Sequence, residues 1–185
     1  EMFCQVNVGL WSGTLSEELI DSTFKRDIQL NKLERSARKE VLNHLATRKG
    51  QGDLPYCFVL INVVKDAERI GDYVKNLVEL WSIAPLPEDD TEERSELRAL
   101  GLIVEGLTQR LKEEFHASNS DGALEQVRQA KDVGRRADAL IERIATSGRS
   151  SQETTVLVLM ARYYKRIASH AGNILSSVIM PLHKI

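Results

Sequence analysis

The chain has 185 residues, of which 27 are Asp or Glu and 25 are Lys or Arg, so its formal net charge is −2. This balance excludes a strongly basic nucleic-acid-binding protein, because contacts to phosphate backbones require a clear excess of Lys and Arg. Hydrophobic residues make up 42% of the chain and charged residues 28%, which is typical of a soluble globular protein. The longest apolar run, residues 156–161, is much shorter than the ~18 residues that a membrane span needs.

Five long segments carry apolar residues at a helical period, and their borders contain the usual start and stop signals. Ser16 and the two glutamates after it predict the N-terminus of the first segment, since a serine caps free backbone N–H groups and acids favour the helix dipole there. Residues 85–90 (PLPEDD) read as a linker because two prolines and an acidic run interrupt the period. The segments are residues 16–48, 55–81, 91–116, 121–147 and 152–177.

An internal repeat divides the chain into two halves. Residues 69–77 (RIGDYVKNL) recur 97 positions later as residues 166–174 (RIASHAGNI), with Arg, Ile and Asn identical in register. The second copy lies on the last of three helical segments. By symmetry we expect the first copy to lie on the last of three helices as well, with residues 2–13 as the shortened opening helix of the first unit. The prediction is an all-α fold of two tandem three-helix bundles, residues 1–86 and 87–185.

Acidic residues of the first repeat fall on common helix faces. Glu68 and Asp72 are four residues apart, and Asp27 and Glu34 are seven apart on the preceding segment. If the two helices are antiparallel, four carboxylates could converge, and a cation such as Mg²⁺, Mn²⁺, Fe or Zn²⁺ would neutralise them. The alternative is that these acids are solvated and pair with neighbouring Lys and Arg side chains. Spacing alone leaves both interpretations open.

The residues around this acidic pair resemble a known family. Residues 66–76 (DAERIGDYVKN) are similar to the Glu-Arg-Ile-Gly-Asp-His-x-x-Asn motif of PhoU, the phosphate-uptake regulator, and residues 27–34 resemble that family's preceding helix. Residues 163–174 resemble the second copy of the motif, and residues 176–181 continue as in some bacterial members. The resemblance extends from about residue 15 to the end of the chain, and it implies the same fold of two tandem three-helix bundles.

This resemblance implies a cytoplasmic regulator rather than an enzyme. PhoU proteins couple a phosphate ABC transporter to a sensor histidine kinase and suppress the phosphate-starvation response, so the implied partners are the transporter ATPase and the kinase. A homodimer that reaches the membrane only through its partners is expected. Several members bind metal on the Glu-x-x-x-Asp faces. This implies a metal ion (Fe, Zn, Mn or Mg) held by Glu68 and Asp72, with Asp27 and more weakly Glu34 adding to the set.

The second repeat departs from this pattern. Lys165 stands where the motif has Glu, and Ser169 stands where it has Asp, so no metal is expected there. From residue 154 to the end the chain contains no Asp or Glu. A basic cluster at helical spacing is instead a candidate surface for an anion or an acidic partner, the alternative being an exposed polar face. Its members are Arg162, Lys165, Arg166 and His170.

Two features of the sequence bear on the compartment and on other functions. Cys4 and Cys57 show neither a disulfide framework nor zinc-ribbon spacing, and no signal peptide is visible, so a reducing cytoplasm is expected. Residues 1–5 do not resemble a natural start, so we expect further chain before them. A cytosolic domain of a sodium–phosphate cotransporter therefore stays open as an alternative, which the full gene length would resolve. A metal-dependent enzyme is a third class, but no nucleophile or cleft is evident from the sequence.

Overall fold

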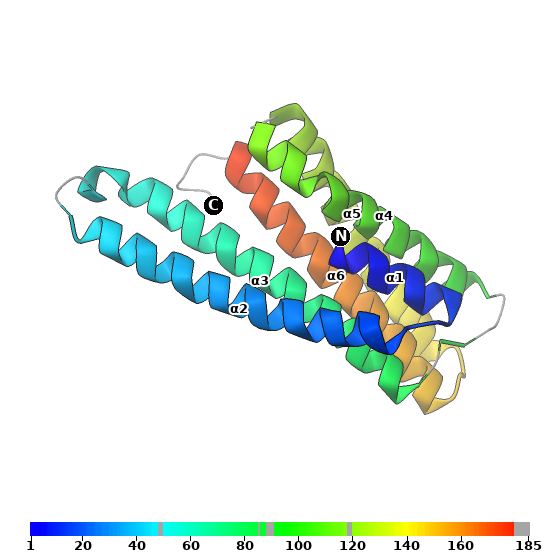
Figure 1. Ribbon diagram of the computed structural model, residues 1–185. Helices are drawn as coiled ribbons and strands as arrows, with labels where there is room; N and C mark the ends of the chain where they lie inside the picture. Colours follow the sequence, from blue (N-terminus) through cyan, green and yellow to red (C-terminus); the bar gives the residue numbers. More distant parts are fainter. Residues whose placement is uncertain (48–49, 85, 88–90, 118–119, 180–185) are drawn as a thin grey trace.

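The computed structural model describes residues 1–47, 50–84, 86–87, 91–117 and 120–179. These residues form six α-helices and one short 3-10 helix, with no strand among them, which confirms the all-α prediction. The helices follow one another as long rods (Figure 1). Their bounds are α1 Met2–Ser12, α2 Glu17–Leu45, α3 Leu54–Ile83, α4 Glu92–Ala117, α5 Ser120–Thr146 and α6 Ser151–Ile179, with the 3-10 helix at Gly50–Asp53.

Local chemistry sets the ends of the first helices. Gly13 ends α1 in the left-handed conformation at φ 69°, where a residue without Cβ is favoured. Ser16 caps α2 as predicted, because its Oγ accepts a hydrogen bond from the Leu19 backbone N–H at 3.2 Å. Pro55 lies in the first turn of α3, where its missing N–H costs no helical hydrogen bond. Each predicted helix exists, with ends shifted by up to three residues.

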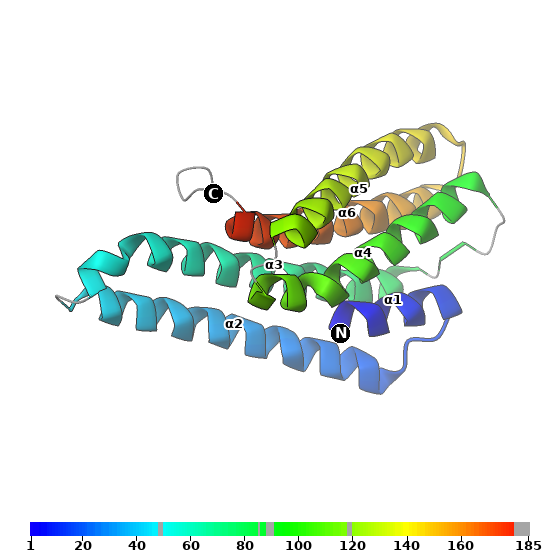
Figure 2. The same ribbon diagram turned by 90° about the horizontal axis from the view of Figure 1, so that it is seen from above.

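The two halves of the chain meet along α3 and α6. Helices α4, α5 and α6 pack together, α6 lies against α3, and α2 pairs with α3 as a long hairpin. The end of this hairpin projects beyond α4–α6 in both views (Figures 1 and 2). The predicted linker lies partly outside the described residues, at 85 and 88–90, so the boundary at residue 86 stays a prediction. Leu86 itself is buried in the core.

A buried polar network fixes the short helix α1. The Tyr164 hydroxyl of α6 is fully buried, donates a hydrogen bond to Asn7 Oδ1 and accepts one from Trp11 Nε1 at 3.1 Å. Asn7 also donates through Nδ2 to Glu105 Oε2 of α4 at 3.3 Å. A Cβ added at Gly101 would lie 3.0 Å from both Asn7 Oδ1 and the Tyr164 hydroxyl, so this glycine makes room for the network. Hydrogen bonds therefore tie α1 to α4 and α6.

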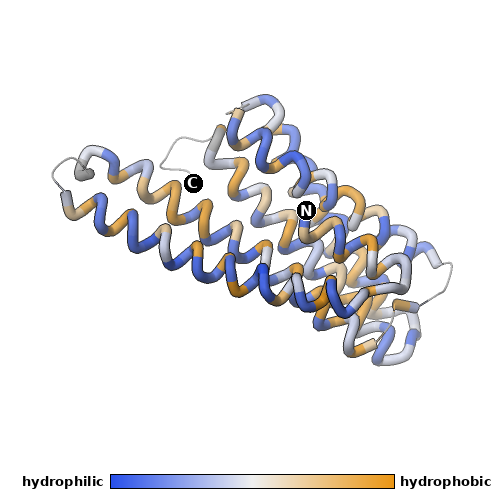
Figure 3. The backbone as a smooth tube through the Cα atoms, viewed as in Figure 1, coloured by the Kyte–Doolittle hydropathy of each residue, from blue (hydrophilic) through white to orange (hydrophobic). Residues whose placement is uncertain are grey.

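Apolar side chains are distributed unevenly over the surface. The core follows the inner faces of α3–α6 and α1, whereas the projecting hairpin alternates hydrophilic and hydrophobic positions along its length (Figure 3). Near the hairpin end, several large apolar side chains are at least 45% exposed. They are Leu42, Leu54, Tyr56, Phe58 and Leu60. None of the described helices is long and apolar enough to cross a membrane.

Candidate functional site

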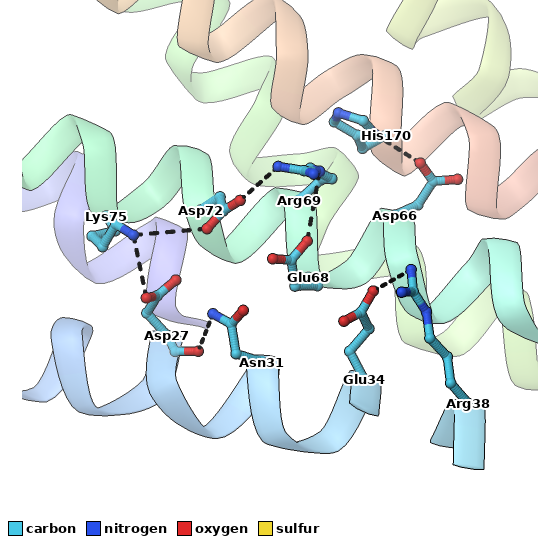
Figure 4. Close-up of polar contacts among 10 residues, drawn as sticks. All are labelled: Asp27, Asn31, Glu34, Arg38, Asp66, Glu68, Arg69, Asp72, Lys75 and His170. Atoms are coloured by element: carbon cyan, nitrogen blue, oxygen red, sulfur yellow. Dashed lines mark hydrogen bonds and ion pairs between the residues drawn. The ribbon is translucent and has the colours of Figure 1, made fainter. Parts of the chain in front are cut away.

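The predicted acidic residues lie on facing sides of α2 and α3. Asp27 and Glu34 point from α2 towards Glu68 and Asp72 on α3 (Figure 4). Close approach of the helices depends on Gly71, because a Cβ at that position would overlap the Leu30 side chain of α2. The motif glycine between the two α3 acids therefore brings α2 against the surface that carries them.

Each of the four acids has a cationic partner from the same chain. Lys75 Nζ lies 3.3 Å from Asp27 Oδ2 and 3.7 Å from Asp72 Oδ1, so one ammonium bridges the two helices. Arg69 lies 3.0 Å from Asp72 Oδ2 and 3.6 Å from Glu68 Oε2.

Glu34 pairs with Arg38 on its own helix at 2.5 Å. Local pairing with Lys and Arg, one of the two interpretations that spacing left open, is therefore the arrangement in this structure (Figure 4).

Electrostatics show that these carboxylates still influence one another. Burial raises the pKa of Glu68 above its usual value of 4.5, and the charge of Asp72 adds to this effect. Arg69 lowers the pKa of Glu68, while Glu34 and Asp27 raise it further. At Glu68, burial and the neighbouring carboxylates therefore outweigh the compensation from Arg69.

Lys75 responds in the complementary way. Burial by itself lowers the pKa of Lys75, but the hydrogen bond to Asp27 and the charges of Asp27, Asp72 and Glu79 outweigh that effect and raise it. The ammonium is consequently held in its charged form between the two helices. It occupies the position from which a bound cation would neutralise Asp27 and Asp72.

The donor set does not fit a metal ion in this arrangement. Among the described residues, no group of three or more His, Cys, Asp or Glu side chains is placed to hold one. A divalent cation at Asp27, Glu68 and Asp72 would have to displace the Lys75 ammonium and the Arg69 guanidinium, both of which repel it. The metal ion implied by the resemblance therefore stays a prediction.

The predicted basic cluster of α6 is divided between two sides of the helix. Lys165 turns to α5, where its Nζ lies 2.6 Å from both carboxylate oxygens of Asp138. Ser169 donates to the Lys165 backbone carbonyl at 2.8 Å, and Arg162 is exposed. Arg166 and His170 instead face α3 and line a groove between the two helices. The cluster is thus not a single surface.

The contact across this groove involves residues that sequence analysis did not bring together. His170 Nδ1 lies 2.7 Å from Asp66 Oδ1 of α3, and both side chains are 17% exposed. The His170 ring also stacks on Tyr73, which in turn lies 6.0 Å from the Tyr163 ring. The repeat contained a signal for this contact. Asp66 is equivalent to Tyr163, and Tyr73 is equivalent to His170. These four residues meet where α3 packs against α6.

The fold and the site define a class of protein: an all-α tandem repeat whose motif helices pack against each other and carry polar, charged faces. Residues 14–80 match the family model described as the PhoU domain. The chain is also 28% identical over 160 residues to the phosphate-specific transport system accessory protein PhoU homolog of Pseudomonas aeruginosa, which covers 83% of this chain. Residues 14–80 are thus similar to a PhoU domain, and most of the chain is similar in sequence to a PhoU homolog. The chain spans 65% of the length of that relative.

Solved structures agree with this fold. The crystal structure of PhoU from Pseudomonas aeruginosa superposes with a TM-score of 0.80 at 23% identity, covering 96% of this chain and 86% of that one. The phosphate transport system regulatory protein PhoU from Streptococcus pneumoniae gives a TM-score of 0.77 at 16% identity, with 96% and 84% coverage. At these identities the likeness concerns the fold.

Proposed function

We propose that this protein is a cytoplasmic accessory protein of a phosphate transport system. It limits phosphate uptake and the phosphate-starvation response by binding the ATPase of a phosphate ABC transporter, a sensor histidine kinase or both, and it has no catalytic activity of its own. The proposal rests on the PhoU domain at residues 14–80, and the PhoU-like fold over 96% of the chain is consistent with it. A homodimer is part of the same proposal.

The projecting hairpin supports a role that depends on binding. Tyr56 is 72% exposed and Phe58 is 60% exposed near the end of α2–α3, away from α4–α6. Large exposed aromatic and apolar side chains are enriched at protein interfaces. We assign this end of the hairpin to the transporter ATPase, since the similar protein of Pseudomonas aeruginosa is an accessory protein of a phosphate-specific transport system.

A genetic experiment tests the regulatory role. Deleting the gene is expected to raise alkaline phosphatase expression in phosphate-rich medium, and supplying the gene on a plasmid is expected to restore repression. Unchanged phosphatase expression in the deletion strain, with phosphate uptake also unchanged, would contradict the proposed function.

A binding experiment tests the assigned surface. The purified transporter ATPase is immobilised and titrated with wild-type protein and with a Tyr56→Ser/Phe58→Ser variant. We expect the double variant to bind at least tenfold more weakly, because two exposed aromatic anchors are removed. Leu102→Ser is the matched control, since Leu102 is 60% exposed but lies on α4. Equal affinity of both variants would show that the hairpin end is not the contact surface, and binding to the kinase alone would reassign it.

A further inference from the structure

A polar groove of about 740 Å³ lies between α3 and α6, on the side of α3 away from α2. Four of its lining residues are basic: Lys65 and Arg69 come from α3, and Arg166 and His170 come from α6. Asp66 is the one carboxylate among the described residues that line it. The groove therefore combines cationic groups from both motif helices, including the two arginines that occupy equivalent positions of the repeat.

The charges in this groove are not all compensated by the protein. Asp66 Oδ1 is paired with His170 Nδ1 at 2.7 Å and accepts a hydrogen bond from Asn173 Nδ2 at 3.3 Å. Arg69 is held by Asp72 and Glu68, which leave part of its guanidinium fork for another acceptor. Lys65 and Arg166 are exposed and have no ion-pair partner among the residues that the structure describes. These two cations are the ones available to a ligand.

Two packed helices, α3 and α6, carry these cations. Tyr73 and His170 stack with ring centroids 5.7 Å apart, and the Asp66–His170 contact joins α3 to α6. A ligand in the groove would therefore meet donors carried by two packed helices rather than by loops.

From this arrangement we propose that the α3–α6 groove binds a phosphate group, either free or as a monoester. A phosphate presents several acceptor oxygens and up to two negative charges, which match an arginine fork and a lysine that approach from opposite helices. A carboxylate ligand would be satisfied by one arginine fork alone. The additional lysine therefore favours a phosphate, which has further oxygens and a second negative charge. The volume leaves space beside one phosphate for the organic part of an ester. This site goes beyond the proposed regulatory function and does not depend on it.

Isothermal titration calorimetry at low salt tests the site on the isolated protein. Inorganic phosphate and AMP are titrated separately, up to about 10 mM, which is roughly tenfold above a millimolar dissociation constant. Adenosine serves as the uncharged control. Saturable binding of phosphate alone supports the free anion as the ligand, and binding of AMP without adenosine supports a monoester. No binding of either anion, or adenosine binding as tightly as AMP, would overturn the proposal.

Variants locate the binding in the groove. Lys65→Gln/Arg166→Gln is expected to weaken binding by about tenfold to hundredfold, since it removes two charge-assisted contacts. Arg135→Gln is the matched control, because Arg135 is an exposed arginine of α5 that does not line this groove. Both substituted sites are exposed, and unchanged thermal unfolding will confirm that the variants fold. Equal weakening by the control would mean that binding reflects overall charge, which would overturn the site.

Discussion

Tyr73 stacks on His170 with ring centroids 5.7 Å apart and ring planes 21° apart. The two residues occupy the same position in the two copies of the repeated motif, so the repeat brings equivalent positions into contact with each other. The adjacent Asp66–His170 pair follows from the same crossing of α3 and α6. This contact joins the motif helices of the two halves, and its residues line the basic groove.

The Asp66–His170 pair should show a measurable coupling. A double-mutant cycle with Asp66→Asn and His170→Gln is expected to give about 1 kcal/mol of interaction free energy, because both side chains are partly buried. Urea unfolding at pH 6 provides the measurement.

The His44–Asp53 pair is a matched control, with the same residue types at 2.8 Å but with side chains 47% and 52% exposed. Its coupling should be smaller, since solvent screens exposed charges. A coupling at Asp66–His170 no larger than this control would contradict the role assigned to it.

Tyr164→Phe should destabilise the protein by about 1–3 kcal/mol. The substitution removes the hydroxyl that donates to buried Asn7 and accepts from Trp11, and it leaves their polar atoms unsatisfied. Thermal unfolding followed by circular dichroism measures the loss. Tyr163→Phe is the comparison, since that neighbouring ring is only partly buried, and a similar loss in both variants would argue against the network.

Glu68→Gln should stabilise the protein at pH 7 and have no such effect near pH 3. The folded-state pKa of Glu68 is raised, so the folded protein binds this proton more tightly than the unfolded chain does. The penalty of the charged form is complete above the folded pKa and disappears below the ordinary value of 4.5.

Relief of the repulsion from Asp72 at i,i+4 contributes about 0.2–0.5 kcal/mol to this stabilisation. Chemical unfolding at the two pH values measures the change in the free energy of unfolding. A variant less stable than wild type at pH 7 would refute the argument.

Arg136→Gln should destabilise the protein at pH 7, whereas Glu68→Gln should stabilise it at that pH. Hydrogen bonds from Arg136 at 2.8 and 3.1 Å lower the pKa of Glu96, so the pair stabilises the folded state above pH 4.5, and this stabilisation is lost as the pH falls through the folded pKa.

We expect a cost of about 1 kcal/mol at pH 7, which becomes smaller as the pH falls below 4.5. Arg135→Gln changes the same charge one residue away, where the side chain is 80% exposed. An equal cost at pH 7 and near pH 3 would point to packing instead.

Metal binding at the acidic face should depend on Lys75. Wild-type protein and a Glu68→Ala/Asp72→Ala variant are compared by elemental analysis after purification, and equal metal content would exclude the first-repeat site. Lys75→Gln is expected to increase the affinity for divalent cations, because it removes the ammonium that bridges Asp27 and Asp72. Metal content unchanged by this substitution would show that Lys75 does not compete with a cation.

Local chemistry was sufficient to predict much of this protein from its sequence. Helical periodicity and the Ser16 cap placed the helices to within three residues, because these signals act between neighbours along the chain. The motif around Gly71 predicted the resemblance to PhoU that the domain match at residues 14–80 supports, and its spacing placed Glu68 and Asp72 one turn apart on a common face.

Tertiary structure decided how the charges are used. Lys75 is close to Asp72 along α3, but its contact with Asp27 spans 48 residues and arises only when α2 packs against α3. Lys165 turns to Asp138 and His170 to Asp66, 104 residues away, because successive positions of α6 face different helices. Sequence spacing defines which residues share a helix face, whereas the neighbouring helix determines whether that face meets a cation, an anion or solvent.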